Sequence, residues 1–133
     1  MAHVTILDGG TGVLLHLLGM PKDPLVWSAK ALVDDSLNSL VVQAHEAYLK
    51  AGATAIITNK YPITPVQMRN AGFEDNDARR LCSLTANLVR QAAGPKGEGK
   101  TIFGSLSPLV KSFRNEQLLP ETDAQATRYE LMK

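Results

Sequence analysis

With 133 residues, 44% of them hydrophobic, the chain is long enough to form one domain with a buried core. Its net charge of +1, from 14 basic and 13 acidic side chains spread along the sequence, argues against nucleic acid as a partner. The sequence has no apolar run of the roughly 20 residues that a membrane span needs, and one cysteine excludes an intrachain disulfide framework. We therefore expect a cytoplasmic protein without a membrane partner.

The N-terminal part predicts a strand, a tight turn and a helix. Val4–Leu7 is apolar or β-branched and stops at a turn, which is typical of a short buried strand. The segment DGGTG follows at residues 8–12, and its glycines permit positive φ angles and close approach to the backbone. Thr11–Leu18 is then expected to form a short helix that ends at Gly19.

The middle of the chain predicts two helices and a second strand. Trp27–Val33 favours a short helix, with Trp27 as a core anchor under the first loop. A longer helix is expected to be capped within Asp34-Asp35-Ser36, and Gly52 supplies its end. Ala53–Thr58 has the composition of a buried strand.

The remaining sequence predicts three helical segments and a third strand. Val66–Ala71 favours a helical turn, and Asp77 is expected to cap a longer amphipathic helix. Thr101–Ser105 is the third strand, and Glu121–Lys133 has a helical pattern. Strands separated by helices indicate a parallel sheet with right-handed crossovers, and so an α/β fold.

Polar or glycine-rich residues follow each predicted strand: Asp8-Gly9, Thr58-Asn59 and Gly104-Ser105. The carboxyl ends of parallel strands meet at one edge of a sheet, where such folds place their sites. Backbone N–H groups at Gly9 and Gly10 suit a carboxylate or phosphate, and the Asp8 carboxylate suits an ammonium group. The pattern fits a zwitterionic amino acid. A plain strand-to-helix turn, with Asp8 as its cap, is the alternative.

Four collinear segments resemble the homocysteine S-methyltransferase family: ILDGGTG at 6–12, WSAKAL at 27–32, HEAYLKAGATAIITNKY at 45–61 and FGSLSPLVKSFRNE at 103–116. The resemblance implies a (β/α)8 TIM barrel, of which this chain supplies the N-terminal portion with about three parallel strands. It also implies transfer of a methyl group to the thiol of homocysteine, which gives methionine. In that family a zinc ion held by three cysteines binds the thiol as a thiolate. The identity of the methyl donor stays open.

The resemblance assigns substrate-binding roles to five residues. Asp8 matches the acid that contacts the homocysteine amino group, and Gly9 and Gly10 match the turn beside the amino acid. Thr58 matches the hydroxyl residue that follows the second strand, close to the same substrate. Tyr61 stands where the family often has an aromatic residue.

Further matches concern the wall of the pocket, and one position departs from the family pattern. Ser105 and Pro108 match a Gly-Ser-x-x-Pro turn, and Phe113-Arg114 matches an aromatic–basic pair that shapes a loop. Lys60 stands where many relatives have a small hydroxyl residue. The lysine either alters the donor side of the pocket or points to solvent.

The family's zinc cysteines belong to strands that this sequence does not contain. Cys82 is the single cysteine, and its place on a predicted apolar helix face favours packing. One cysteine cannot form the tetrahedral zinc site, so we expect no cofactor bound by this chain's own residues and no catalytic residue in it. A complete barrel needs about 250 residues, so residues 1–133 are expected to be a partial, C-terminally truncated domain that is inactive alone.

Two other functions remain open. The first is an inactive partial barrel that associates with itself or with another chain through its open sheet edge. The second is a different (β/α) enzyme that binds an anion at Gly9–Gly12. His3, His16 and His45 lack a second histidine at metal-binding spacing, and we expect His45 to be a partly buried or surface residue.

Overall fold

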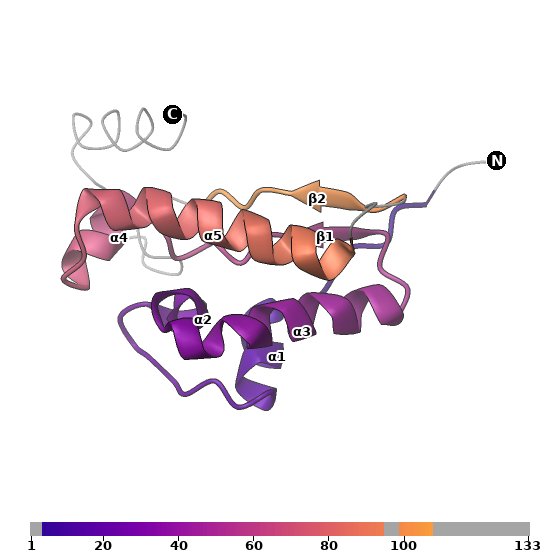
Figure 1. Cartoon of the computed structure of the whole chain (residues 1–133), viewed down its shortest axis with the longest axis horizontal. Helices are drawn as coiled ribbons and strands as arrows, with labels where there is room; N and C mark the ends of the chain where they lie inside the picture. The colour runs from indigo at the N-terminus through magenta and orange to yellow at the C-terminus, as the bar shows by residue number, and fades with distance from the viewer. Residues whose placement is uncertain (1–3, 95–98, 108–133) are drawn as a thin grey trace, which may run out of the picture.

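Helices lie along one side of a small parallel sheet in the computed structural model, which describes residues 4–94 and 99–107 (Figure 1). The elements in chain order are α1 (Thr11–Leu17), η1 (Trp27–Ala29), α2 (Lys30–Val33), η2 (Asp35–Leu37), α3 (Asn38–Lys50), β1 (Ala55–Ile57), α4 (Pro65–Asn70), α5 (Asp75–Ala93) and β2 (Thr101–Phe103). The alternation of helices with parallel strands confirms the predicted α/β class. The expected helix at Glu121–Lys133, with Pro108 and Phe113-Arg114, lies outside the described residues.

The sheet has two parallel strands, β1 and β2, which pair in the register Ile56 to Ile102. The N-terminal segment runs beside β1 on its other edge. There Leu7 forms one parallel bridge with Ala55, and the Ala55 N–H donates to the Ile6 carbonyl at 3.0 Å. The predicted first strand is therefore reduced to a bridge in the described part of the chain.

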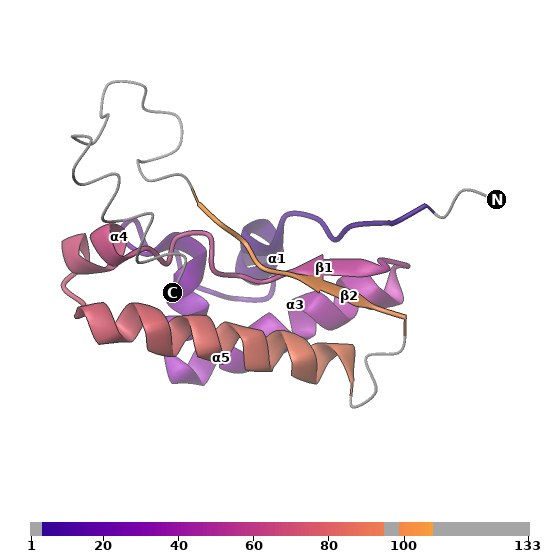
Figure 2. The same cartoon turned by 90° about the horizontal axis from the view of Figure 1, so that it is seen from above.

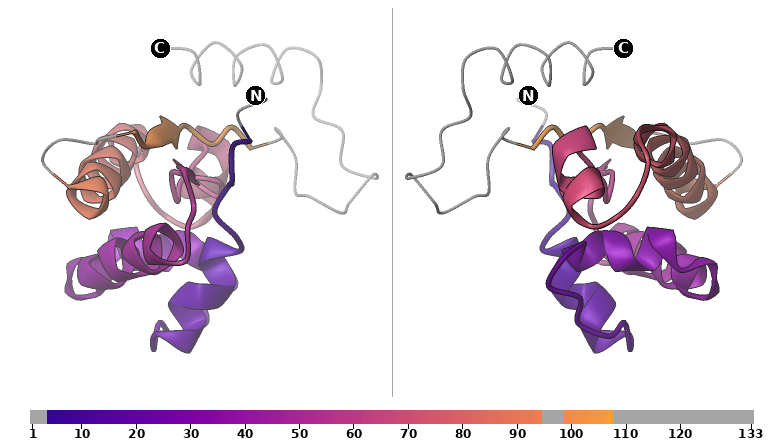
Figure 3. Two further views of the ribbon diagram at one scale, coloured as in Figure 1. Left: turned by 90° about the vertical axis from the view of Figure 1, so that its right-hand side faces the viewer. Right: turned by 90° about the vertical axis from the view of Figure 1, so that its left-hand side faces the viewer.

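The expectation that Val4–Leu7 is buried was wrong, since Ile6 and Leu7 are each 53% exposed. Helices α1, α3 and α5 lie in an arc around one side of the strands (Figure 3). Side chains on the opposite face of the strands, such as Phe103, are exposed within the described structure. The first segment lies at the edge of the sheet, and its consecutive residues Ile6 and Leu7, which point to opposite faces, are both exposed.

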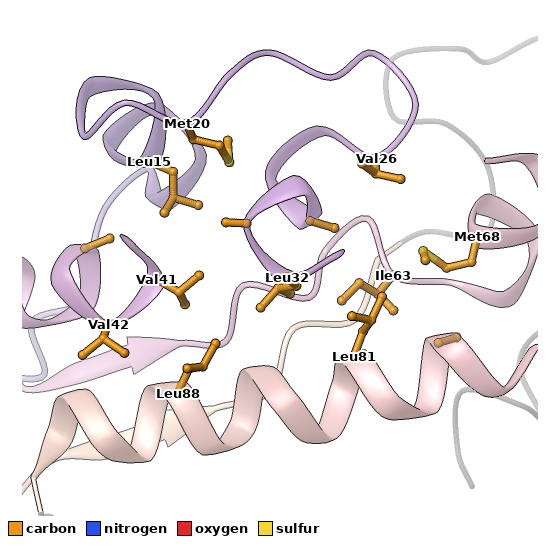
Figure 4. Packing of buried hydrophobic residues seen from close by; sticks show 14 residues of the cluster. Leu15, Met20, Val26, Leu32, Val41, Val42, Ile63, Met68, Leu81 and Leu88 are labelled. Atoms are coloured by element: carbon orange, nitrogen blue, oxygen red, sulfur yellow. The ribbon is translucent and has the colours of Figure 1, made fainter. Parts of the chain in front are cut away.

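The hydrophobic core lies between α3 and α5, which run side by side (Figures 1 and 2). Leu81 and Leu88 of α5 point toward side chains of α2, α3 and the loop after β1 (Figure 4). Leu32, Val41 and Leu81 are completely buried. The packing of α5 against α3 holds α3 beneath β1. It therefore determines which side chains of α3 lie near the end of the first segment.

The start of α5 differs from the prediction that Asp77 caps it. Glu74 is the N-cap residue, and its side chain accepts a hydrogen bond from the N–H of Asp77. Asp77 in turn accepts from the Glu74 N–H at 3.1 Å, which completes a capping box. The helix begins at Asp75 because this reciprocal pair satisfies two N–H groups that otherwise lack partners.

Trp27 is not the predicted core anchor. Its side chain is 37% exposed, and its indole Nε1–H donates to the Pro24 carbonyl at 3.1 Å. The residue also has a φ of +48°, a left-handed backbone conformation that residues other than glycine rarely adopt. Cys82, in contrast, is partly buried and packs against the core cluster. Among the described residues, no helix is long and apolar enough to cross a membrane.

Candidate functional site

A cavity of about 220 Å³ lies at the carboxyl ends of the strands. It is lined by residues from four separate parts of the chain: Asp8, Gly9, Thr11, Gly12, Ser28, Ile57, Thr58, Asn59, Tyr61 and Ser105. The structure thus brings four of the five predicted site residues together. Gly10 is not among the lining residues and instead forms the N-cap of α1.

The side chain of Asp8 is only 2% exposed although the residue lines this cavity. Its Oδ2 accepts a hydrogen bond from the Ile57 N–H at 2.9 Å. The Ala55 N–H, two residues before Ile57, donates to the main-chain carbonyl of Ile6. At Ile57 the side-chain oxygen of Asp8 takes the place of the main-chain carbonyl that would accept the next hydrogen bond of the sheet. The sheet pairing therefore ends where the carboxylate begins.

His45 of α3 does not line the cavity but lies next to this carboxylate, with its Nδ1 3.8 Å from the Asp8 Oδ2. The imidazole is completely buried, so the expectation of a partly buried or surface histidine was wrong. Neither ring nitrogen has a hydrogen-bond partner among the described residues. Burial lowers the pKa of His45, and the Asp8 carboxylate opposes this with a smaller effect, so the ring is neutral at pH 7.

Tyr48, one helical turn after His45, packs against Gly9. A Cβ atom at Gly9 would lie 3.0 Å from the Tyr48 Cε1 and 3.1 Å from its hydroxyl oxygen. Burial and the nearby Asp8 carboxylate raise the pKa of Tyr48. Neither Gly9 nor Gly10 has a positive φ, so close approach to the ring, rather than backbone conformation, explains the glycine at position 9.

Thr58 and Asn59 hold two further walls of the cavity in place. The Thr58 Oγ1 accepts a hydrogen bond from the Ser105 N–H at 3.1 Å, which ties the end of β1 to the end of β2. The Asn59 Nδ2 donates to the Ser28 carbonyl at 3.0 Å and so joins this loop to η1. Sequence reasoning missed Ser28, because nothing in the local pattern of η1 connects it with the strand ends.

Tyr61 lies at the edge of the cavity and is 38% exposed. Lys60 does not line the cavity; its main-chain N–H donates to the Thr58 carbonyl, and its carbonyl accepts from the Ile63 N–H. The substitution at position 60 therefore places no ammonium group in the walls of this cavity.

The side chains of residues 4–94 and 99–107 do not provide a metal site. They contain no group of three or more histidine, cysteine or acidic side chains arranged to hold an ion. Cys82 lies on α5 within the core packing, not at the cavity. A zinc ion bound by three cysteines does not fit the donors of this chain, whose sequence has one cysteine.

A family model described as homocysteine S-methyltransferase matches residues 5–133. A homocysteine S-methyltransferase of Escherichia coli is 28% identical over 111 residues, which cover 79% of this chain and 35% of that protein. A selenocysteine methyltransferase of Astragalus bisulcatus is 33% identical over 90 residues, covering 68% of this chain and 26% of that protein. The chain therefore spans well under half the length of these curated relatives.

A solved structure gives the same result for the fold. The crystal structure of the homocysteine methyltransferase MmuM from Escherichia coli, in its metallated form, aligns with a TM-score of 0.79 and 25% sequence identity. The alignment covers 97% of this chain and 49% of that chain.

Proposed function

Because the chain belongs to the homocysteine S-methyltransferase family, we propose that it forms the amino-acid-binding part of an enzyme that methylates the thiol of homocysteine to give methionine. The observation that carries this proposal is a buried carboxylate, Asp8, facing a cavity of about 220 Å³ at the carboxyl ends of parallel strands. A cavity of this size suits a small amino acid, and a buried carboxylate favours a cationic group there.

The α-ammonium group of homocysteine binds the Asp8 carboxylate in this proposal. The Oδ2 of Asp8 accepts a hydrogen bond from the Ile57 N–H, and no described residue donates to its other oxygen, Oδ1. Oδ1 is therefore the oxygen available to the ligand. A charge-assisted hydrogen bond in such a buried site is stronger than the same contact in water.

The substrate carboxylate lies beside the backbone of Gly9 and near the Thr58 hydroxyl, both of which line the cavity. Gly9 has no side chain to cover its peptide group, and Thr58 accepts from Ser105, which leaves the hydroxyl hydrogen to donate to the ligand. Tyr61 covers the edge of the cavity. Together these residues fit a zwitterion with its two charges held on opposite sides.

The remaining parts of the expected enzyme are proposed to lie in polypeptide that this sequence does not include. They are the zinc ligands, the binding site for the methyl donor and the later strands of a (β/α)8 barrel. No step of methyl transfer is assigned to Asp8, Thr58 or Tyr61, whose role is binding. A cytoplasmic location is part of the same proposal, since the single cysteine suits a reducing compartment.

A second candidate function is a partial barrel that associates with itself or with another chain. Exposed apolar side chains in the first segment and in and after β2 favour it: Val4, Ile6, Leu7, Ile102, Phe103 and Leu106. Light scattering over a range of concentrations tests it. A folded monomer at every concentration would exclude self-association.

Calorimetric titration with homocysteine tests the first proposal. Asp8→Asn keeps an oxygen to accept the Ile57 N–H but removes the negative charge, so we expect at least a tenfold loss of affinity, which corresponds to about 1.4 kcal/mol. Asp35→Asn, at an exposed aspartate of η2 outside the cavity, is the matched control and should bind like the wild type. Equal affinity of the Asp8→Asn variant would contradict the proposal.

A further inference from the structure

We propose that His45 is a positioning residue for Asp8: from α3 it orients the carboxylate toward the ligand ammonium group and does not itself touch the ligand. The inference rests on the proposed function, in which Asp8 binds the amino group of homocysteine. It adds a residue from a helix to a site otherwise formed by strand ends and loops.

The burial of His45 is the first observation. The side chain is completely buried, yet neither of its nitrogens has a hydrogen-bond partner among the described residues. Buried polar groups are nearly always hydrogen-bonded, because an unpaired one loses its interaction with water without replacement. An imidazole in this place therefore requires a nearby hydrogen-bond acceptor.

The direction of the ring supplies that partner. His45 Nδ1 lies 3.8 Å from the Asp8 Oδ2, which is about 0.9 Å longer than a normal N–H···O hydrogen bond. A small shift of the imidazole closes this gap while the Ile57 N–H holds the carboxylate in place. Since an ionised carboxylate only accepts, the Nδ1–H tautomer is the one that faces it.

The two protein contacts of Asp8 converge on a single oxygen. The Ile57 N–H is 2.9 Å from Oδ2, and His45 Nδ1 approaches the same atom from α3. His45 is not among the residues that line the cavity, so it approaches Asp8 from outside that lining. With Oδ2 held by two donors, the plane of the carboxylate is fixed and Oδ1 is directed toward the cavity.

The charge state of His45 suits this role. The titratable groups that act on this part of α3 are Asp8, from the first segment, and Tyr48, one turn later on the same helix. Burial lowers the pKa of His45, so at pH 7 the ring is a neutral donor. A neutral donor orients the carboxylate without cancelling the negative charge that an ammonium group needs, whereas lysine or arginine would cancel it.

A purely structural role, in which His45 only fills the core, predicts a different pattern of ligand binding. Loss of core packing would weaken every ligand of the cavity alike. Loss of a positioning contact to Asp8 would weaken only ligands that carry the ammonium group. Homocysteine and 4-mercaptobutanoate, which has the same thiol and carboxylate but no amino group, separate the two.

The test measures both ligands by calorimetry on the full chain and two variants. His45→Leu has a similar volume and no donor, and we expect it to lose about tenfold in affinity for homocysteine with little change for 4-mercaptobutanoate. His45→Asn retains an N–H near the Nδ1 position and should stay within about threefold of the wild type for both ligands. An equal loss for both ligands in His45→Leu, or no loss for either, would overturn the inference.

A second measurement covers the case in which His45→Leu does not fold. Nitrogen NMR of the wild-type histidines, with the His45 signals assigned from the His45→Asn variant, reports the tautomer. We expect the Nδ1–H form, with a shift of Nδ1 when homocysteine is added and none with 4-mercaptobutanoate. The Nε2–H form in the homocysteine complex would refute the inference. A wild type that binds neither ligand would instead remove the proposed function on which it rests.

Discussion

The contact between Gly9 and Tyr48 makes Gly9→Ala an informative substitution. A methyl group at position 9 would lie 3.0 Å from the Cε1, 3.1 Å from the hydroxyl oxygen and 3.2 Å from the Cζ of Tyr48. Carbon atoms in favourable contact are about 3.5–4.0 Å apart, so either the ring or the strand end must move by roughly half an ångström. Because Asp8 precedes Gly9 directly, that movement also disturbs its 2.9 Å hydrogen bond with the Ile57 N–H.

The expected loss of stability follows from two opposing effects. Overpacking costs about 1–3 kcal/mol in a filled core, and the half-buried Tyr48 ring beside Gly9 places this site in the lower part of that range. Replacing glycine with alanine restricts the unfolded chain and returns about 0.4–1 kcal/mol, since the φ at position 9 is not positive. We therefore expect Gly9→Ala to lower the free energy of unfolding by about 1–2 kcal/mol in urea titrations. The affinity for homocysteine should fall as well.

Gly10→Ala is the matched control. A Cβ atom there meets Val13 Cγ2 at 3.8 Å, which is an ordinary contact, and Gly10 has a φ of −67°. Its free energy of unfolding should stay within about 0.5 kcal/mol of the wild type. Equal stability of the two variants would refute the argument that Tyr48 requires glycine at position 9. The double variant Gly9→Ala/Tyr48→Leu should recover part of the loss, because leucine lacks the outer ring atoms.

Three further outcomes are expected. Burial holds the pKa of His45 below its ordinary value of 6.5, so in acid the unfolded chain binds a proton that the native chain excludes. The free energy of unfolding should therefore fall as the pH drops below about 6.5, by at most about 1.4 kcal/mol per pH unit. His45→Asn should lack this part of the slope when urea titrations at about pH 7.5 and 5.5 are compared with the wild type, and an unchanged slope would contradict the burial argument. Glu74→Ala removes one half of the capping box and should lower the free energy of unfolding by about 1 kcal/mol, whereas Glu46→Ala on α3 serves as the control without a cap. Phe103→Ser should reduce any self-association seen by light scattering, since Phe103 is exposed on the uncovered side of the strands, and an unchanged mass distribution would place the interface elsewhere.

Local pattern was enough to predict most elements of the described fold. Helix α1 was expected at Thr11–Leu18 and occupies Thr11–Leu17, because its apolar residues recur at helical spacing. The pattern failed for Val4–Leu7, because this segment lies at the edge of the sheet with side chains of both faces exposed, among them Ile6 and Leu7. It also failed for Trp27, which is 37% exposed and donates to the Pro24 carbonyl, a local contact that composition does not reveal.

The same limit explains which cavity residues were found. Asp8, Thr58 and Ser105 each follow a strand, so the shared direction of parallel strands predicts that they meet. Whether they bind homocysteine stays a prediction. His45 lies four residues after Val41 on the buried face of α3, and that spacing is a signal for burial that was available in the sequence. Its approach to Asp8, however, depends on how α3 packs beneath β1, which no local pattern contains.

The double role of Asp8 connects the fold to the proposed ligand site. Its Oδ2 takes the place of a main-chain acceptor for the Ile57 N–H, so the carboxylate ends the pairing with β1 and cannot move far without loss of that bond. Because the Asp8 side chain forms part of the sheet's hydrogen bonding, it is already ordered before a ligand binds. Binding an ammonium group at Oδ1 then requires little further ordering of the protein, and affinity gains from such preorganisation. The glycines at 9 and 10 contribute differently: position 9 admits the Tyr48 ring, and position 10 begins α1, so only the first constrains how α3 approaches the carboxylate.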